Sequence, residues 1–194
     1  MKKAFLILTS LAGMVSIALI ACTSGSAKTE NPVVISQDSL VKRGSYLVNS
    51  IGCDDCHSPK KMGPQGPEID MEHRFSGHLA NSPMGKPNTS VMKDGYVLFA
   101  MDLTSAIGPW GQSYSANISS DETGIGNWSE EQFMRAIREG KSKGMKEGRP
   151  LLPPMPWFVY KNLSDTDLKA IFAFLKTTTP VHNVVPGPKS LKEL

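Results

Sequence analysis

The first apolar run of the chain covers residues 4–20 and follows two lysines. It is short for a membrane-spanning helix and ends abruptly, which is typical of a signal peptide that is removed on export. Residues 22–37 are mostly small or polar and lack apolar periodicity, so they predict a flexible tether. We therefore expect a signal peptide over residues 1–21, a folded domain over residues 38–182 and a C-terminal tail over residues 183–194.

Apolar residues recur at helical spacing in the first part of the predicted domain. Ser36 or Asp38 can accept hydrogen bonds from first-turn amides, so the helix is expected to start near them. Gly44 is unfavourable inside a helix, and its presence predicts close approach by another helix. The apolar face is formed by Leu40, Val41, Gly44, Leu47, Val48 and Ile51.

Two further helices are predicted near the end of the chain, each from a start signal and an apolar face. Ser129 begins a capping box with acidic residues in the first turn, and Gly140 ends that helix. Ser164 starts the second helix in the same way, and Pro180 follows its end. We expect this last helix to pack against the one that contains Gly44. The inward faces are Phe133, Ala136 and Ile137 in the first helix, and Leu168, Ile171, Phe172 and Leu175 in the second.

The segment 58–116 is interrupted by many glycines and prolines, which exclude long helices. We expect a set of loops there. Residues 96–101 are compatible with either a short strand or a buried extended run, and the pattern does not decide between them.

The run Cys53-Asp54-Asp55-Cys56-His57 adds chemistry to this picture, because C-x-x-C-H is the pattern by which haem is attached covalently to protein. Two thiols three positions apart on one helical turn can reach the two vinyl groups at a porphyrin edge. The imidazole of His57 then lies beneath the iron as its proximal ligand. The sequence therefore predicts one covalent haem c, with the loops of residues 58–116 over its edge.

A redox dithiol and half of a zinc site use the same two cysteines. The histidine directly after the second cysteine favours haem. A zinc site needs a second pair of ligands, and the third cysteine, Cys22, belongs to the targeting segment. A redox motif is expected after a strand, whereas a predicted helix precedes this one. A redox dithiol and a chance occurrence stay as alternatives.

Leu19-Ile20-Ala21-Cys22 resembles the lipobox of bacterial lipoproteins, in which cleavage before the cysteine leaves Cys22 to carry lipid. Several acyl chains on one residue bind a membrane stably. The alternative is an ordinary signal peptide with an incidental cysteine. Thr23 is not the aspartate that retains lipoproteins at the inner membrane in some Gram-negative bacteria. We therefore predict an exported, lipid-anchored protein on the periplasmic side of a bacterial membrane, with the outer membrane favoured in a Gram-negative host.

The formal charge of +3 falls to +1 when Lys2 and Lys3 leave with the signal peptide, and two haem propionates would make the protein neutral or slightly acidic. No nucleic-acid partner is therefore expected. The remaining length allows one domain of ordinary size. Aromatic residues are few and Gly and Pro are frequent, so haem would form much of the core.

The second axial ligand has to be chosen among ten methionines and several histidines. Met155 lies in Pro153-Pro154-Met155-Pro156-Trp157, a stiff loop that can present a thioether to iron at little entropic cost. Met145 is the reserve candidate, and Met134 is expected to fill the core. Three histidines are possible ligands that we expect on the solvated surface instead: His73, His78 and His182.

Several further motifs accompany C-x-x-C-H. They are Arg43-Gly44-Ser45-Tyr46-Leu47, Asn117-Ile118, Thr123-Gly124-Ile125-Gly126-Asn127-Trp128, Arg138-Glu139-Gly140, Met155-Pro156-Trp157, Tyr160, Leu163-Ser164-Asp165, Asp167-Leu168 and Ile171. With them the chain resembles class I c-type cytochromes, and especially the cytochrome c domains associated with bacterial membrane-bound alcohol and aldehyde dehydrogenases. The resemblance covers most of the chain after the signal peptide.

The resemblance implies an all-α, class I cytochrome c fold of several helices around one haem, with a long Gly/Pro-rich loop insertion. It implies axial ligation of the iron by His57 and Met155. It also implies that Asn117 and Trp128 lie near the haem propionates, with a turn and a packing tryptophan as the alternative. Dehydrogenase subunits of this kind commonly carry several haem motifs in tandem, whereas this chain has one and no internal repeat.

We predict a lipid-anchored monohaem electron carrier rather than an enzyme, since one-electron cycling with both axial positions filled needs no acid–base pair and no nucleophile. The expected partners are redox proteins: a dehydrogenase, a quinol-oxidising complex, or a terminal oxidase or reductase. Two alternatives stay open. One is a haem subunit held tightly in a dehydrogenase or reductase complex. The other, if Met155 does not ligate, is an open-iron sensor or oxidase-like enzyme.

Overall fold

The computed structural model describes residues 36–194, which combine helices with two small antiparallel sheets. The predicted signal peptide, Cys22 and nearly all of the predicted tether lie outside the described residues. The α-helices are α2 (Gln37–Ser50), α3 (Cys53–His57), α4 (Glu130–Arg138), α5 (Trp157–Tyr160) and α6 (Asp165–Leu175). The strands are β1 (Lys60–Gly63), β2 (Gly66–Ile69), β3 (Leu98–Phe99), β4 (Ser105–Gly108) and β5 (Gly111–Tyr114). Short 3-10 helices are η1 (Met71–His73), η2 (Thr89–Asp94), η3 (Ser142–Gly144) and η4 (Leu191–Glu193).

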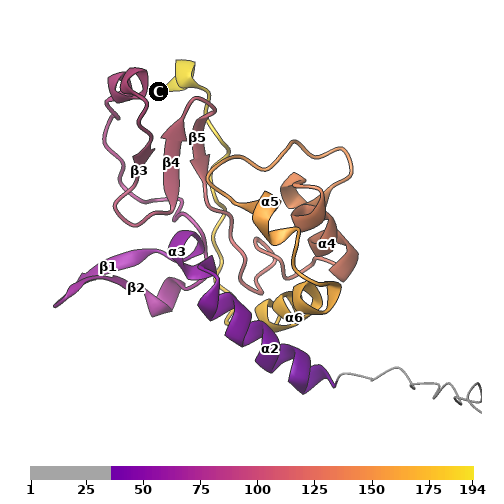
Figure 1. The fold of residues 1–194 in the computed structure, drawn as a ribbon. Helices are drawn as coiled ribbons and strands as arrows, with labels where there is room; N and C mark the ends of the chain where they lie inside the picture. Colours follow the sequence, from indigo (N-terminus) through magenta and orange to yellow (C-terminus); the bar gives the residue numbers. More distant parts are fainter. Residues whose placement is uncertain (1–35) are drawn as a thin grey trace, which may run out of the picture. The chain divides into compact units, whose positions relative to one another are not determined.

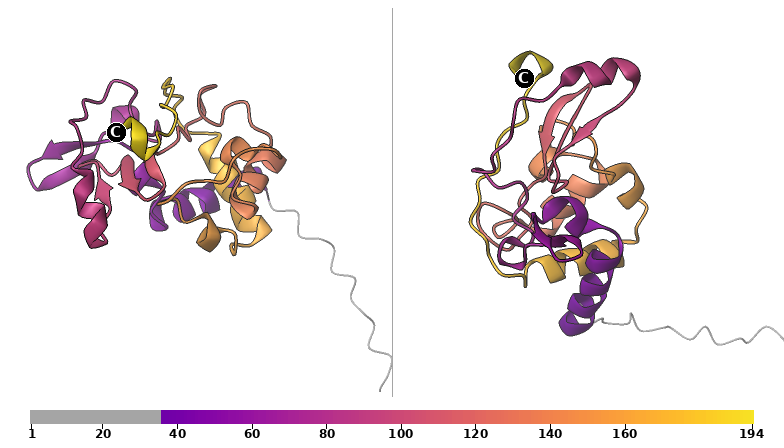
Figure 2. Two further views of the ribbon diagram at one scale, coloured as in Figure 1. Left: turned by 90° about the horizontal axis from the view of Figure 1, so that it is seen from above. Right: turned by 90° about the vertical axis from the view of Figure 1, so that its left-hand side faces the viewer.

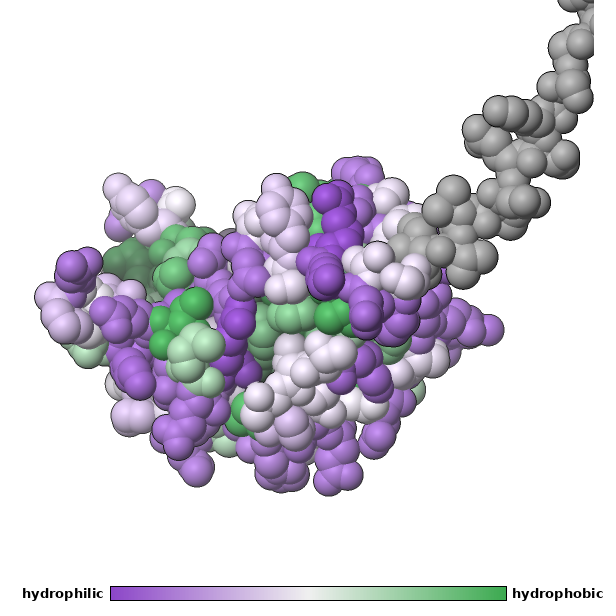
Figure 3. Space-filling view, turned by 90° about the horizontal axis from the view of Figure 1, so that it is seen from below, coloured by the Kyte–Doolittle hydropathy of each residue, from purple (hydrophilic) through white to green (hydrophobic). Residues whose placement is uncertain are grey.

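Within these residues, α4, α5 and α6 gather on one side and the strands on the other (Figure 1 and Figure 2). The surface seen from below is largely hydrophilic, with hydrophobic side chains in separate groups (Figure 3). None of the helices in this part of the chain is long and apolar enough to cross a bilayer.

Helix α2 begins and packs as its sequence predicts. The Ser36 hydroxyl accepts a hydrogen bond from the amide of Ser39 (3.3 Å) and so caps the first turn. The helix lies against α6, and a Cβ atom added at Gly44 would come within 1.9 Å of the carbonyl oxygen of Ala170. The close approach predicted at Gly44 is therefore confirmed, and the approaching helix is the predicted one.

Both later helices have the predicted N-caps. The Ser129 hydroxyl accepts from the amide of Gln132 (3.1 Å), and the Ser164 hydroxyl accepts from the amide of Asp167 (3.0 Å). The side-chain amide of Gln132 donates to the carbonyl of Lys143 (2.8 Å) and holds η3 against α4. The reciprocal bond of a capping box is not made at Ser129 in the described structure.

One hydrophobic core lies between α2, α4 and α6. Gly140 ends α4 with φ +63°, and a Cβ atom there would meet the Trp157 ring at 2.5 Å, so the helix end also packs against α5. The buried members of the core are Leu47, Val48, Phe75, Ile125, Phe133, Ile137, Leu168, Ile171 and Leu175. This arrangement agrees with the predicted inward faces of α4 and α6, and with that of α2 from Gly44 onward, whereas Leu40 and Val41 are only partly buried and are not among the core residues.

Residues 58–116 contain two small sheets that the prediction of an all-α fold did not include. β1 pairs with β2, and β4 lies between β3 and β5, all in antiparallel register. Gly108 pairs with Gly111 at the tight turn between β4 and β5, where Gly111 has φ +95°. The helices around a common core fit the predicted class, whereas the all-α description is too narrow. The alternative of a strand within residues 96–101 is realised by β3.

The segment 183–194, predicted as a C-terminal tail, contacts two other parts of the fold. Asn183 is buried, and its side chain donates to the carbonyl oxygens of Ser76 and His78 (2.8 Å each). The backbone of Lys189 pairs with β5. These contacts hold the segment after η1 and the outer edge of β5 to the end of the chain.

Candidate functional site

The two cysteines of the C-x-x-C-H motif lie on α3, which follows α2 after a short turn. Gly52 precedes α3 with φ +83°, a backbone conformation that favours glycine. Cys53 and Cys56 are unpaired and partly exposed. Their spacing places both thiols on the same side of the helix. As predicted, a helix and not a strand precedes the motif.

His57 is held at one ring nitrogen. Its Nδ1 lies 2.7 Å from the carbonyl oxygen of Ala116, and its own carbonyl accepts a hydrogen bond from the amide of Gly77 (2.8 Å). Gly77 has φ +72°, and a Cβ atom there would lie 2.3 Å from the carbonyl oxygen of Ser115. Burial lowers the pKa of His57, which favours the neutral imidazole that binds metals. The Nδ1 bond fixes the ring and leaves Nε2 as the nitrogen for a ligand.

The environment of the thiols disfavours a redox dithiol and a zinc site. Burial, reinforced by the carboxylates of Asp54 and Asp55, raises the pKa of Cys53 to about 12, whereas a redox dithiol needs a lowered thiol pKa. Burial also raises the pKa of Cys56. Among residues 36–194, neither cysteine joins a group of three metal-ligating side chains, so a zinc site is not formed there.

Asp54, between the two cysteines, is a site residue that the sequence interpretation missed. It is buried, and its carboxylate accepts two hydrogen bonds from Arg74, at 2.9 Å from Nε and 2.6 Å from Nη2. The hydroxyl of Ser58 donates a third at 2.7 Å. The available signal was a charged residue inside a motif that is expected to be partly buried. A buried carboxylate needs a cation or hydrogen-bond donors, so a partner for Asp54 could have been expected.

Lys60 caps the other end of α3. Its ammonium group donates to the carbonyl oxygens of Asp54 (3.0 Å) and Ser58 (2.8 Å), and also to that of Asp55. A cation at a helix C-terminus satisfies carbonyl groups that have no partner within the helix. The short helix α3 is therefore held near its start by the Asp54 carboxylate and at its C-terminus by the Lys60 ammonium group.

Met155 lies in the loop before α5, and this loop is tied to the fold on both sides. The hydroxyl of Ser113 donates to the carbonyl oxygen of Pro153 (2.6 Å). The hydroxyl of Tyr160 donates to the carbonyl oxygen of Ile51 (2.7 Å), just before α3. Met155 itself is partly buried and packs against the core, as Cys53 does. The loop is therefore fixed near the end of α2 from which the C-x-x-C-H motif continues.

The other two methionines considered as ligands are in different settings. Met145 is 59% exposed, in the loop that follows η3. Met134 is partly buried on α4 and packs against the core, as expected for a residue that fills space. Of the two loop methionines, Met155 is the one that packs against the core cluster, as Cys53 does.

Asn117 is buried, and both ends of its side chain are used within the protein. Its amide donates to the hydroxyl of Thr123 (3.0 Å) and the carbonyl oxygen of Val181 (2.8 Å). Its oxygen accepts from the amide and the hydroxyl of Ser119 (2.9 and 2.8 Å). These hydrogen bonds are the ones expected if Asn117 stabilises a turn. A contact with a haem propionate would have to replace one of them.

Trp128 packs against the core from the end of the same loop. Its indole N–H has no hydrogen-bond partner among residues 36–194, and the indole is only partly buried. A tryptophan in this setting has a donor available at the edge of the core. Of the two residues expected near the propionates, Trp128 is the one with a donor to offer.

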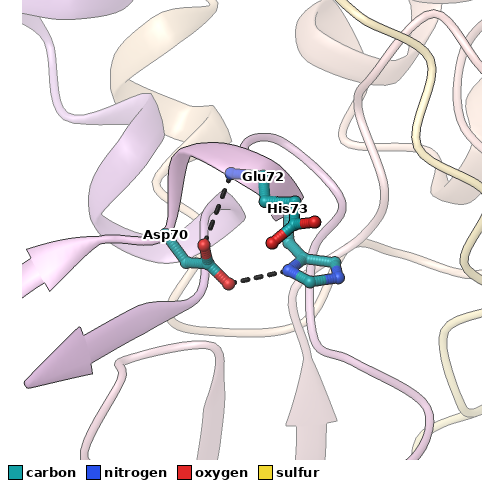
Figure 4. Close-up of side chains that lie close together, drawn as sticks. All are labelled: Asp70, Glu72 and His73. Atoms are coloured by element: carbon teal, nitrogen blue, oxygen red, sulfur yellow. Dashed lines mark hydrogen bonds and ion pairs between the residues drawn. The ribbon is translucent and has the colours of Figure 1, made fainter.

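The three histidines considered as ligands have separate surroundings. His73 accompanies Asp70 and Glu72 in a cluster on η1, where Asp70 accepts from the His73 ring (2.7 Å) and from the Glu72 amide (Figure 4). These bonds cap η1, so the cluster is explained without an ion. His182 is exposed beside Asp121, as predicted.

The prediction that His78 lies on the solvated surface is wrong. His78 is 3% exposed, its Nδ1 lies 2.7 Å from the Thr104 hydroxyl, and its ring packs on Tyr114 with centroids 4.8 Å apart. The hairpin of β4 and β5 supplies this cover, and the sequence pattern did not predict that hairpin.

An apolar cavity of about 270 Å³ lies beside β3 and β4. It is lined by Met84, Pro87, Asn88, Leu98, Phe99, Ala100, Ser105 and Ile107, and by none of the C-x-x-C-H residues. Ligand sites for small molecules are usually larger and contain several convergent polar groups. We therefore do not treat it as the functional site.

The residues around the motif fit a covalently bound haem. The donor set consists of two free thiols on one helical side and one imidazole with Nδ1 fixed. Apolar side chains from several segments pack on the core without being fully covered, and Cys53 of the motif and Met155 are among them. The others are Ile51, Ile118, Trp128, Met134, Tyr160, Leu163, Phe172 and Phe174.

Comparison with known proteins confirms the resemblance to c-type cytochromes of dehydrogenases. The chain is 33% identical over 159 residues to the gluconate 2-dehydrogenase cytochrome c subunit of Pantoea cypripedii, over 81% of this chain and 26% of that protein. It is 29% identical over 184 residues to the fructose dehydrogenase cytochrome subunit of Gluconobacter japonicus, over 93% of this chain and 30% of that protein.

A shorter stretch of 80 residues is 46% identical to a subunit of the nicotinate dehydrogenase of Pseudomonas putida, over 41% of this chain and 6% of that protein. No family model matches the chain. The chain spans less than a third of the length of each of these relatives. It is thus similar, over most of its own length, to cytochrome c subunits of bacterial dehydrogenases.

Proposed function

We propose that this chain is a c-type cytochrome with one haem that transfers single electrons for a dehydrogenase. The observation that carries the proposal is α3, with two free thiols on one side and a histidine held through Nδ1. When bound, haem c supplies one-electron chemistry between ferric and ferrous iron. The chain's own residues attach that group, provide its axial ligands and limit its contact with water.

The proposed attachment uses both cysteines. Cys53 and Cys56 would hold the porphyrin through thioether bonds, and addition of each S–H across one vinyl group would need no oxidant. His57 would offer Nε2 to the iron, and the hydrogen bond from its Nδ1 to the carbonyl oxygen of Ala116 fixes the ring plane and raises the basicity of the imidazole. Met155 would offer its thioether as the second ligand from a loop fixed by Ser113.

The similar proteins support a dehydrogenase as the redox partner, because their names identify them as cytochrome subunits of gluconate and fructose dehydrogenases. We propose the same relationship for this chain, either as a bound subunit or as a separate carrier. The other proposed redox partners are a quinol-oxidising complex, as an alternative electron donor, and a terminal oxidase or reductase, as the electron acceptor. The sequence contains one C-x-x-C-H motif, which is the basis for proposing a single haem.

We propose that lipid on Cys22 attaches the protein to the periplasmic side of a bacterial membrane, with the outer membrane favoured in a Gram-negative host. The support is the sequence Leu19-Ile20-Ala21-Cys22 after an apolar run, together with Thr23. Mass spectrometry of the N-terminal peptide from the membrane fraction tests this part. A diacylated cysteine at the new N-terminus is expected, and an unmodified Cys22 would contradict it.

The proposed ligation is tested by visible absorption spectra of the oxidised protein, produced from the full chain in a host with haem-attachment machinery. We expect haem that remains bound after acidic solvent extraction, and a weak far-red methionine–iron band. The band should be absent in Met155→Ala and unchanged in the matched control Met145→Ala. A high-spin wild-type spectrum would favour an open-iron sensor or oxidase-like enzyme, and the absence of covalent haem would refute the proposal.

A further inference from the structure

We propose that Asp54 and Arg74 form a buried charge pair that positions the haem-attachment helix and helps to set the reduction potential of the iron. This inference rests on the proposed function, since it concerns the same haem. It adds two residues that belong neither to the C-x-x-C-H ligands nor to the methionine loop. Asp54 acts on the iron through its charge and through α3, so it is a positioning residue.

The contacts of Asp54 are built for a carboxylate. Both of its oxygens receive a hydrogen bond from Arg74, and one also receives the Ser58 hydroxyl. Burial alone would raise the pKa of Asp54, but the hydrogen bonds from Arg74 and Ser58 lower it below its ordinary value. The hydroxyl of Ser58 in turn accepts the amide of Phe75 (3.0 Å), which completes a closed network.

Arg74 connects three parts of the fold at this point. Besides Asp54 on α3, its guanidinium donates to the side-chain oxygen of Asn49 in the last turn of α2 (2.5 Å) and lies over the Phe75 ring, 4.4 Å from its centroid. The carbonyl oxygen of Phe75 accepts the amides of Ile118 and Ser119 (2.8 and 3.1 Å).

This path leads back to the axial histidine. The segment from Arg74 continues directly to Gly77, whose amide binds the carbonyl of His57. The residues that Phe75 holds follow Ala116, the acceptor for His57 Nδ1. The segment that begins with Arg74 therefore contacts both the helix that carries His57, through Arg74, and the loop that orients its ring, through the carbonyl oxygen of Phe75.

Attachment of a haem to Cys53 and Cys56 would bring the charge of Asp54 close to the iron. Asp54 lies between the two cysteines, so any haem bound to both sulfur atoms lies close to it. The side chains of Asp54 and Arg74 are 12% and 23% exposed, so water screens their charges only in part. An unpaired carboxylate next to the haem would favour ferric iron, and an unpaired guanidinium would favour ferrous iron. The pair is neutral as a unit, and each partner cancels the other's effect.

The test measures reduction potentials by spectroelectrochemistry on the holoprotein at mildly alkaline pH, where the carboxylate stays ionised. Asp54→Asn should raise the potential, because Arg74 is left without its counter-charge. Arg74→Gln should lower it, because the carboxylate is left unpaired. The double variant should lie between the two single variants. A purely structural role would instead shift both single variants in the same direction through the same loosening of α3.

Arg74→Lys keeps the charge and loses the two-pronged hydrogen bonding, so its potential should stay near the wild-type value although its stability falls. It also provides a readout if Arg74→Gln does not accumulate as holoprotein. The matched control is the ion pair between α2 and α6, formed by Arg43 and Asp167. Arg43 lies on α2 about 10 Å along the helix from its end at Ser50, and a turn separates that end from Cys53. Arg43→Gln and Asp167→Asn should leave the potential nearly unchanged.

The outcomes separate this inference from the proposed function. If the wild type holds covalent haem with its methionine band, and the two single variants shift the potential in opposite directions by more than the controls do, the charge pair has the proposed role. If haem is bound normally and both variants shift it in the same direction or not at all, the inference is overturned while the cytochrome assignment stands. A wild type without covalent haem overturns both.

Discussion

Replacement of Gly44 by alanine tests the closest helix contact in the fold. A Cβ atom at this position would lie 1.9 Å from the carbonyl oxygen of Ala170, 2.5 Å from its carbonyl carbon and 2.7 Å from Phe174 Cβ. Two of these neighbours belong to the backbone of α6 and cannot rotate away. The helices α2 and α6 would have to separate by roughly 1 Å or more to remove the clash.

Two effects of opposite sign determine the size of the change at Gly44. Alanine gains about 1 kcal/mol of helix propensity over glycine. Overpacking of a close-packed interface costs about 1–3 kcal/mol and sometimes more, and a backbone clash belongs at the upper end of that range. We therefore expect a net loss of about 2 kcal/mol in the free energy of unfolding. With a urea dependence of about 1–3 kcal/mol per molar, the unfolding midpoint should fall by about 1 M.

The assay is urea unfolding of the holoprotein followed by far-ultraviolet circular dichroism. Gly85→Ala is the matched control, because no atom lies within 4 Å of the Cβ position there, and its stability should stay within about 0.5 kcal/mol of wild type. If Gly44→Ala leaves the midpoint unchanged or raises it, helix propensity has outweighed the clash. The packing of α2 on α6 would then be looser than described.

Two further predictions concern the methionine loop and the loss of stability at acidic pH. Ser113→Ala removes the hydrogen bond to Pro153, worth about 1 kcal/mol, so the methionine–iron band that the proposed ligation by Met155 predicts should disappear at a lower temperature while the helical signal keeps its midpoint. Parallel loss of both signals would contradict this. The pKa of Asp54 lies below 3.8 in the folded protein, so the carboxylate adds stability at higher pH that is lost as pH falls through the folded pKa. In Asp54→Asn, the urea midpoint should therefore change less with pH below about 4, and an equal slope would contradict the linkage.

The long helices could be predicted because their signals are local. Gly44, Ser129 and Ser164 each act within a few residues of chain, through a missing side chain or a cap. Apolar spacing identified the inward faces for the same reason. The capping box at Ser129 was expected to include a bond from the Gln132 side chain back to Ser129. The Gln132 side chain instead donates to the carbonyl oxygen of Lys143 in the neighbouring 3-10 helix.

The sheets could not be predicted, because their strands are short and do not alternate. β4 is Ser105-Ala106-Ile107-Gly108, and all of it is buried, so no period of two separates an inner from an outer face. The burial of His78 could not be predicted for the same reason, because Thr104 and Tyr114, which cover it, belong to the region of that hairpin.

For the candidate site, the sequence identified the motif but not its support. The spacing of Cys53, Cys56 and His57 is a local pattern and could be read directly. The partner of Asp54 is Arg74, twenty residues later. The acceptor for His57 Nδ1 is Ala116, fifty-nine residues later. Such pairs form only when distant segments fold back against α3. The local residue pattern around the motif carries no signal for them.

The contacts of Asn183 have a consequence for the order in which the parts of the fold can form during synthesis. Its side chain binds the carbonyl oxygens of Ser76 and His78, 107 and 105 residues earlier, and accepts the amide of Ala80. These bonds can form only after nearly the whole polypeptide has emerged. The cysteines at positions 53 and 56 emerge long before, while the segment beside them still lacks this last fastening. The segment that includes Gly77, whose amide binds the carbonyl of His57, is therefore fastened to the rest of the fold only when Asn183 has been synthesised.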